Sequence, residues 1–105
     1  MKVYIAGPMT GLPEFNYPAF NKAAEQLRAR GYEVLNPADN KPAMDDPTWL
    51  DWMRLALSQL IQADEVVMLP GWDKSRGATV EYDLAHALGL GVNHLSELTS
   101  VWERK

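Results

Sequence analysis

The stretch GWDKSRGATVEYDLAHALG, residues 71–89, follows an apolar run, Val66–Leu69, that is typical of a buried strand. Its small residues predict a turn at Ser75–Gly77 that opens into a helix. A helix that begins at such a turn offers free backbone N–H groups and the positive end of its dipole, which suit an anion such as a phosphate. One carboxylate, Glu81, lies in the early turns of this helix. It is therefore a candidate nucleophile or base beside a phosphorylated ligand.

The rest of the chain repeats this alternation of strand and helix. Short apolar segments predict strands at 2–6, 32–36, 64–69 and 91–95. Helical spacing of apolar residues predicts helices after each of the first three, and the expected caps are Asn16, Gly31, Asp46 with Pro47, Ser75 and Gly89. The segment 37–47 predicts a loop, and the last ten residues a short helix or a tail.

Strands that alternate with helices indicate parallel βαβ units with right-handed crossovers. The expected fold is α/β: an open parallel sheet of four or five strands with flanking helices, flavodoxin-like or Rossmann-like, as one domain over residues 1–105. Such a sheet binds its ligand beyond the carboxyl ends of the strands, where the strand order reverses. If the first and third strands flank that point, the loops at Gly7–Gly11 and Gly71–Gly77 face one crevice.

Composition narrows the class of protein. The 105 residues are 47% hydrophobic, which is enough for one core, and the net charge of −4 argues against a nucleic-acid partner. The absence of cysteine excludes disulfides and thiolate metal sites and fits a cytoplasmic protein. The N-terminal MKVYIAGPM predicts no signal peptide, and no segment predicts a membrane span. His86 and His94 lack the spacing of metal ligands, so no metal is expected.

Three motifs together carry a resemblance to a known family: Tyr4-Ile5-Ala6-Gly7-Pro8-Met9-Thr10-Gly11, Ser75-x-Gly77-x-x-x-Glu81 and Leu84-Ala85-x-x-Leu88-Gly89. Over about residues 2–95 the chain resembles the nucleoside 2′-deoxyribosyltransferase superfamily. Within it, the chain is most similar to small phage and bacterial members of unassigned function, and it shares features with the 2′-deoxynucleoside 5′-monophosphate N-glycosidases.

The resemblance implies roles for individual residues. Glu81 matches the nucleophile that attacks C1′ of the deoxyribose, and Tyr4 matches the residue that orients it. Glu81 can attack only as the anion, and the helix N-terminus is expected to help keep it ionised. The loop that wraps the nucleoside corresponds to Gly7, Met9, Thr10 and Gly11. Ser75 and Gly77 match the positions at which the monophosphate hydrolases carry Ser and Gly, so the implied ligand has a 5′-phosphate, and Lys74 or Arg76 could add positive charge.

One position departs from the family pattern. The family usually has an Asp that helps to protonate the departing base, and the matching residue here is Ala56. Two functions therefore stay open. One is an enzyme that hydrolyses or transfers the N-glycosidic bond of a 2′-deoxynucleoside 5′-monophosphate without cofactor or metal. The other is a catalytically weakened module that only binds the nucleotide. The resemblance also implies a homodimer or higher homo-oligomer, because a neighbouring subunit completes the family's site.

Simpler interpretations compete with these roles. Glu81 could be a solvated carboxylate near a helix N-terminus, and Ser75 an ordinary helix cap. Trp49 and Trp52 are expected to pack their helix rather than to stack on a base, whereas Trp72 is left open.

Overall fold

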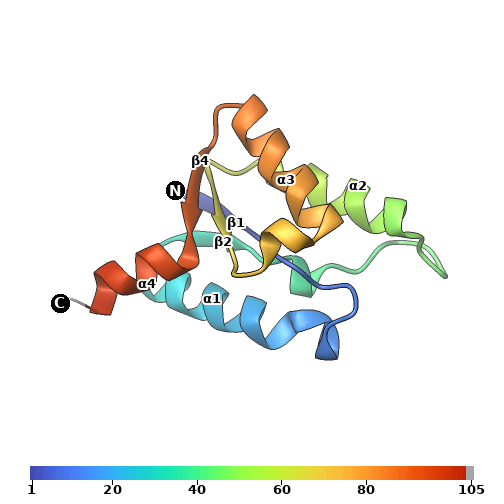
Figure 1. Ribbon diagram of the computed structural model, residues 1–105. Coiled ribbons are helices and arrows are strands. Elements are labelled where there is room, and N and C mark those ends of the chain that lie inside the picture. The colour runs from blue at the N-terminus through green and yellow to red at the C-terminus, as the bar shows by residue number, and fades with distance from the viewer. Residues whose placement is uncertain (104–105) are drawn as a thin grey trace.

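The computed structural model describes residues 1–103 and contains a parallel four-stranded sheet flanked by helices (Figure 1). The strands are β1 (Lys2–Ala6), β2 (Glu33–Leu35), β3 (Glu65–Met68) and β4 (Gly91–His94). The helices are α1 (Tyr17–Ala29), α2 (Trp49–Leu60), α3 (Arg76–Ala87) and α4 (Leu95–Glu103). The predicted α/β class and parallel sheet are confirmed, with four strands in the part of the chain described.

The strand order is β2-β1-β3-β4, so the strand order reverses between β1 and β3. The chain leaves β1 to one side for β2 and then crosses to the other side for β3. Ala6 is paired with Met68 at the carboxyl ends of these two strands, and the Leu69 N–H donates to the Ala6 carbonyl at 2.8 Å. The loops after β1 and β3 therefore leave the sheet side by side, as the sequence predicts.

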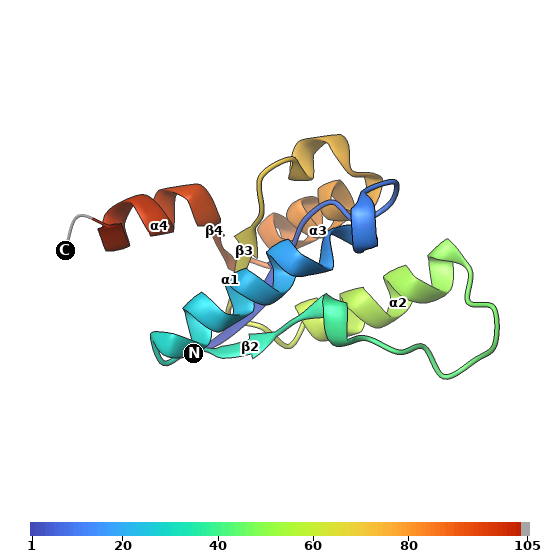
Figure 2. The same cartoon turned by 90° about the horizontal axis from the view of Figure 1, so that it is seen from below.

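Side chains of β1 alternate between the two faces of the sheet, and each face has its own apolar cluster. Val3 and Ile5 pack with α1 and with apolar residues of α4 on one face. Tyr4 and Ala6 pack with α2 and α3 on the other face. Figure 2, seen from below, shows α1 lying across the first face and the loop before α2 projecting away from the sheet.

Helix α2 does not begin where the sequence analysis places its cap. Its N-cap is Thr48, whose hydroxyl accepts from the Asp51 N–H at 3.2 Å, while Asp51 accepts from the Thr48 N–H at 2.8 Å. This reciprocal capping box satisfies two N–H groups at the helix start. Asp46 instead has a φ of 47° within the preceding loop, so the predicted cap at Asp46 and Pro47 is wrong.

Helix α1 begins after Asn16, as predicted, but the Asn16 side chain does not cap it. Its Nδ2 donates to the Pro8 carbonyl at 3.0 Å, which ties the loop after β1 to the start of the helix. Glu14, Phe15 and Asn16 have φ values of 52°, 52° and 62°, a left-handed turn built without glycine. The final segment, predicted as a helix or a tail, forms α4 as far as Glu103. Within residues 1–103, no helix is long and apolar enough to cross a bilayer.

Candidate active site

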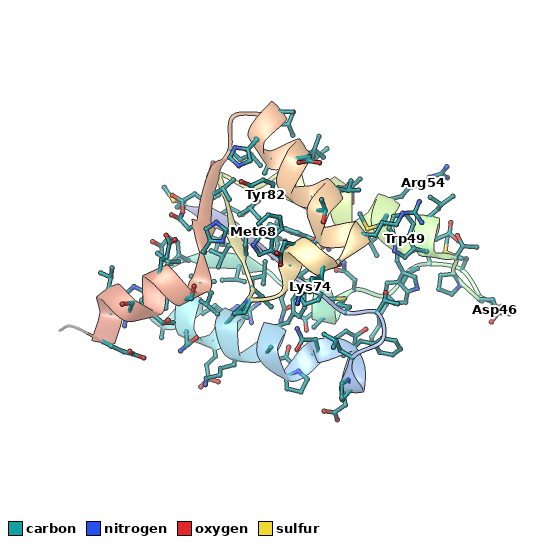
Figure 3. The ribbon with its side chains drawn as sticks, viewed as in Figure 1. Asp46, Trp49, Arg54, Met68, Lys74 and Tyr82 are labelled. Carbon is teal, nitrogen blue, oxygen red and sulfur yellow. The ribbon has the colours of Figure 1, made fainter. Side chains whose placement is uncertain are left out.

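A cavity of about 1060 Å³ lies where the loops after β1 and β3 meet the first turns of α2 and α3. Its floor includes Tyr4 and Glu81, and its walls are mostly apolar. Figure 3 marks two residues of its wall, Trp49 at the start of α2 and Lys74 in the turn before α3. The cavity therefore occupies the position at which open parallel sheets bind ligands.

Glu81 is buried, with 5% of its surface exposed, although it belongs to an amphipathic surface helix. The Tyr4 hydroxyl donates a short hydrogen bond to its Oε2 atom from the centre of the sheet. No hydrogen bond within residues 1–103 reaches its Oε1 atom, and Glu81 lines the cavity. One carboxylate oxygen is thus held by Tyr4 while the other is available to a ligand.

Burial changes the acidity of both partners. It raises the pKa of Glu81 from its usual 4.5 to about 7, an effect that the hydrogen bond from Tyr4 opposes. Burial, and next the charge of Glu81, raise the pKa of Tyr4 well above its usual value. Desolvation is therefore the main influence on the ionisation of Glu81, and the help of the helix N-terminus in keeping the anion stays a prediction. The alternative of a solvated carboxylate is wrong.

The start of α3 forms the polar end of the cavity. The Ser75 hydroxyl caps the helix by accepting from the Ala78 N–H at 3.2 Å. No hydrogen bond within residues 1–103 occupies the N–H groups of Arg76 and Gly77. Ser75, Arg76 and Gly77 all line the cavity, so these two N–H groups are available to an anion.

Two cationic side chains accompany these N–H groups in the lining, Lys74 and Arg76. The Arg76 guanidinium lies over the Trp49 ring, 3.9 Å from its centroid. Such a cation–π contact limits the freedom of a long side chain and keeps its charge at the cavity. The polar end thus combines a helix N-terminus with a fixed positive charge.

Two glycines of the cavity lining lie where an added side chain would meet close neighbours. A Cβ at Gly7 would lie 2.8 Å from the Leu69 Cβ, because the ends of β1 and β3 are packed together there. A Cβ at Gly77 would lie 3.1 Å from the Met53 Sδ, between the first turns of α2 and α3. Gly7 therefore also serves packing, whereas Gly77 lets the two helix starts approach across the cavity.

The structure brings seven of the eight residues selected from sequence into one cavity lining: Tyr4, Gly7, Met9, Thr10, Ser75, Gly77 and Glu81. The eighth, Gly11, is exposed at the turn after β1 with a φ of 81°, and a Cβ there would meet nothing within 4 Å. Gly11 therefore suits the turn and lies outside the lining, so its contact with a ligand stays a prediction.

Ala56 also lines the cavity, and it packs in the same apolar cluster as Tyr4 and Ala78. Glu81 is the only acidic residue among the lining residues of the described chain. Asp51 is occupied by the capping box, and Figure 3 shows Asp46 at the tip of the loop before α2, away from Lys74. Neither Asp46 nor Asp51 therefore takes the place of an acid at position 56.

The tryptophans lie in two different environments. Trp49 and Trp52 line the cavity rather than serving only to pack α2. Trp72 stacks on Tyr82 with ring centroids 4.3 Å apart and belongs to the apolar cluster beneath α3. The wall aromatics Phe15 and Tyr17 were not selected from sequence, and only their closeness to the loop after β1 could have indicated them. Within residues 1–103, no group of three His, Cys, Asp or Glu residues could hold a metal.

Comparison with known proteins gives two kinds of match. A family model described as "Domain of unknown function (DUF4406)" matches residues 1–94. No curated protein matches the sequence. Among solved structures, a 2-deoxyribosyltransferase from the psychrotolerant bacterium Bacillus psychrosaccharolyticus has a TM-score of 0.72 and 23% identity, over 90% of this chain and 71% of that one.

A second solved structure, a 2-deoxyribosyltransferase from Leishmania mexicana, has a TM-score of 0.68 and 18% identity. The match covers 89% of this chain and 62% of the Leishmania chain. At these identities the likeness is one of fold. The resemblance inferred from the sequence motifs is therefore confirmed for the fold.

Proposed function

The chain belongs to the DUF4406 family, a domain of unknown function, and we propose that it cleaves or transfers the N-glycosidic bond of a 2′-deoxynucleoside 5′-monophosphate. The observation that carries this proposal is Glu81, which is buried at the cavity floor with one oxygen held by Tyr4 and the other free. A carboxylate in this arrangement is suited to covalent glycosyl transfer. The fold shared with two 2-deoxyribosyltransferases supports the same class of reaction.

In the proposed reaction, the free Oε1 of ionised Glu81 attacks C1′ of the sugar. The C1′–N bond breaks, its electron pair leaves with the base, and a glycosyl ester forms on Glu81. Water or a second base then attacks C1′, and the electron pair of the ester bond returns to Oε1. Tyr4 acts as a positioning residue, because its hydrogen bond fixes the carboxylate and favours the anion.

The preference for a 5′-phosphate rests on the polar end of the cavity. Free N–H groups at Arg76 and Gly77 and the charges of Lys74 and Arg76 favour an anion there. Glu81 lies further along the same helix, so a ligand whose phosphate is bound at the helix start would extend toward it. A small nucleotide, rather than a nucleic acid, is the proposed ligand.

The second candidate function is nucleotide binding without turnover, and Ala56 is the observation that favours it. General acid help is typically worth about a hundred- to ten-thousand-fold in rate. An apolar side chain in the cavity wall at position 56 supplies none of this help.

The test incubates the protein with each of the four common deoxynucleoside monophosphates and measures the release of free base by chromatography. Glu81→Gln should abolish release while nucleotide binding remains measurable by calorimetry. Glu97→Gln, the same change at an exposed position of α4, is the matched control and should leave release unchanged. Unchanged release in Glu81→Gln would exclude the covalent mechanism. Tight binding without release by the parent protein would establish the binding module instead.

A further inference from the structure

The cavity holds one carboxyl group, and the proposed reaction needs it as an anion. Glu81 is the only acidic residue in the lining of the described chain, and its free oxygen must form the bond to C1′. It therefore cannot protonate the base that leaves in the same step. The Tyr4 hydroxyl is already engaged with Glu81.

The other ionisable side chains in the lining are those of Tyr17, Lys74 and Arg76. Phenol, ammonium and guanidinium groups are weak acids at neutral pH, so they are poor donors to a leaving base. The described cavity is thus built for nucleophilic attack but not for protonation of the leaving group.

A base that already carries a positive charge needs no proton. When Glu81 attacks C1′ of such a nucleotide, the electron pair of the C1′–N bond neutralises the cationic ring, and the base leaves as a neutral molecule. The sugar remains as an ester on Glu81, which water then cleaves. Charge and atoms balance without a general acid.

The cavity wall suits a flat cation. Phe15, Tyr17, Trp49 and Trp52 contribute aromatic rings to it. Aromatic faces attract cations, and the Arg76 guanidinium, 3.9 Å from the Trp49 centroid, shows one such contact within the site. The carboxylate of Glu81 adds a negative charge at the floor.

We propose that the preferred substrate is a 5′-phosphorylated N-glycoside whose base is cationic, such as an N-alkylated purine or a pyridinium. This inference rests on the proposed function, because it specifies the leaving group for the same attack by Glu81. It follows from the single carboxylate of the cavity and from Ala56 in its wall.

The experiment compares 7-methyl-2′-deoxyguanosine 5′-monophosphate with dGMP, two nucleotides that differ by one methyl group and one charge. Base release is followed at near-neutral pH, where Glu81 is still partly ionised and a substantial fraction of the methylated purine is cationic, and spontaneous loss is subtracted with the Glu81→Gln protein. The methylated nucleotide should react at least about a hundredfold faster, the lower range of what a general acid contributes.

Ala56→Asp then tests the cause. An acid at this position should raise release from dGMP and reduce the preference for the methylated nucleotide by about tenfold or more. Ala56→Asn, a neutral side chain of the same shape, should give no such gain. Circular dichroism and thermal melting of both variants establish that they fold. The ratio of base release from the two nucleotides by the parent protein is measured independently of these variants.

Similar rates on the two nucleotides in the parent protein would overturn the inference, because a proton donor would then reach the site, for example from a second copy of the chain. A folded Ala56→Asp that leaves the ratio unchanged would also overturn it. In both cases a Glu81-dependent reaction would preserve the proposed function. Glu81-independent release, or no release from either nucleotide, would overturn both.

Discussion

Among single residues, Glu81 matters most. Burial of its carboxylate destabilises the folded state, and the same burial sets the pKa of the group that the proposed reaction uses as a nucleophile. A carboxylate withdrawn from water favours its protonated form, and only the Tyr4 hydroxyl among the described contacts opposes this. A pKa of about 7 leaves a large fraction of the anion at neutral pH, which suits a group that must act as a nucleophile there.

Stability should therefore fall as pH rises through the range in which Glu81 loses its proton. The folded state keeps the proton up to about pH 7, whereas the unfolded chain releases it near 4.5, so the free energy of unfolding decreases between these values. The shift from 4.5 to about 7 corresponds to about 3 kcal/mol at most. Urea unfolding of the parent and of Glu81→Gln at pH 5 and pH 8 measures it. Equal pH dependence in both proteins would contradict the prediction.

Removal of the Tyr4 hydroxyl should shift the pH profile of the reaction. The hydrogen bond lowers the pKa of Glu81 against the effect of burial, so Tyr4→Phe should raise the pH at which kcat/KM reaches half its maximum. A hydrogen bond to a charged group contributes about 1.5–3 kcal/mol, which predicts a shift of about one unit or more. Tyr32→Phe, on the opposite side of the sheet, is the control. An unchanged profile in Tyr4→Phe would mean that Tyr4 does not position Glu81.

Sequence could select Glu81 and Tyr4 but not their environment. The motif spacing and the family resemblance identify both residues, whereas burial depends on how α3 packs over β1, which one sequence does not specify. For the same reason the sequence does not predict that burial raises the pKa of Glu81. Gly11, which the motif selects as a ligand contact, lies open at the turn with a positive φ, so the backbone favours glycine there and its contact with a ligand stays a prediction.

At the level of elements, the two helix starts that border the cavity are capped in different ways. Helix α2 has a reciprocal capping box between Thr48 and Asp51, and α3 has Ser75 alone. The T-x-x-D spacing at Thr48 was visible in the sequence, but Asp46-Pro47 offered a competing signal two residues earlier. Only the backbone of the loop, with its positive φ at Asp46, decides between them.

Thr48→Ala and Ser75→Ala should separate helix capping from ligand binding. Each removes a cap worth about 1 kcal/mol, and each should lower the melting temperature by about 5 °C. Only Ser75→Ala should weaken binding of a deoxynucleoside monophosphate, by roughly fivefold or more, because only Ser75 lies at the proposed phosphate site. Calorimetry in a Glu81→Gln background avoids turnover. Equal loss of affinity in the two variants would place the phosphate elsewhere.

At the scale of the whole molecule, the sequence predicts the arrangement of the strands better than it predicts the residues that form the walls of the cavity. Alternating strands and helices require parallel pairing, and the reversal between β1 and β3 then positions two glycine-rich loops at one edge. The aromatic wall of the cavity is formed by side chains from the segment after β1 and from the start of α2, which are far apart in sequence. No periodicity connects these segments, so the sequence predicts packing for Trp49 and Trp52 and does not predict the wall that they share with Phe15 and Tyr17.

The outer side of α2 leads to the last prediction, that the chain forms a homodimer or a higher homo-oligomer. Leu50, in the first turn of α2, is 56% exposed, and three lining residues of the nearby cavity, Leu12, Phe15 and Trp52, are 40%, 59% and 37% exposed. Large apolar side chains left exposed on a small domain favour burial against a second copy. Light scattering at micromolar concentrations should give at least twice the mass of 11.8 kDa.

Leu50→Glu should shift the parent oligomer toward the monomer, because a charge in an apolar interface loses hydration without a partner. Val101→Glu is the matched control: Val101 is 51% exposed, but it lies on α4 at the opposite face of the sheet (Figure 1). Its variant should keep the parent mass. A monomeric parent at high micromolar concentration, or loss of the oligomer in Val101→Glu alone, would show that the outer side of α2 is not the interface.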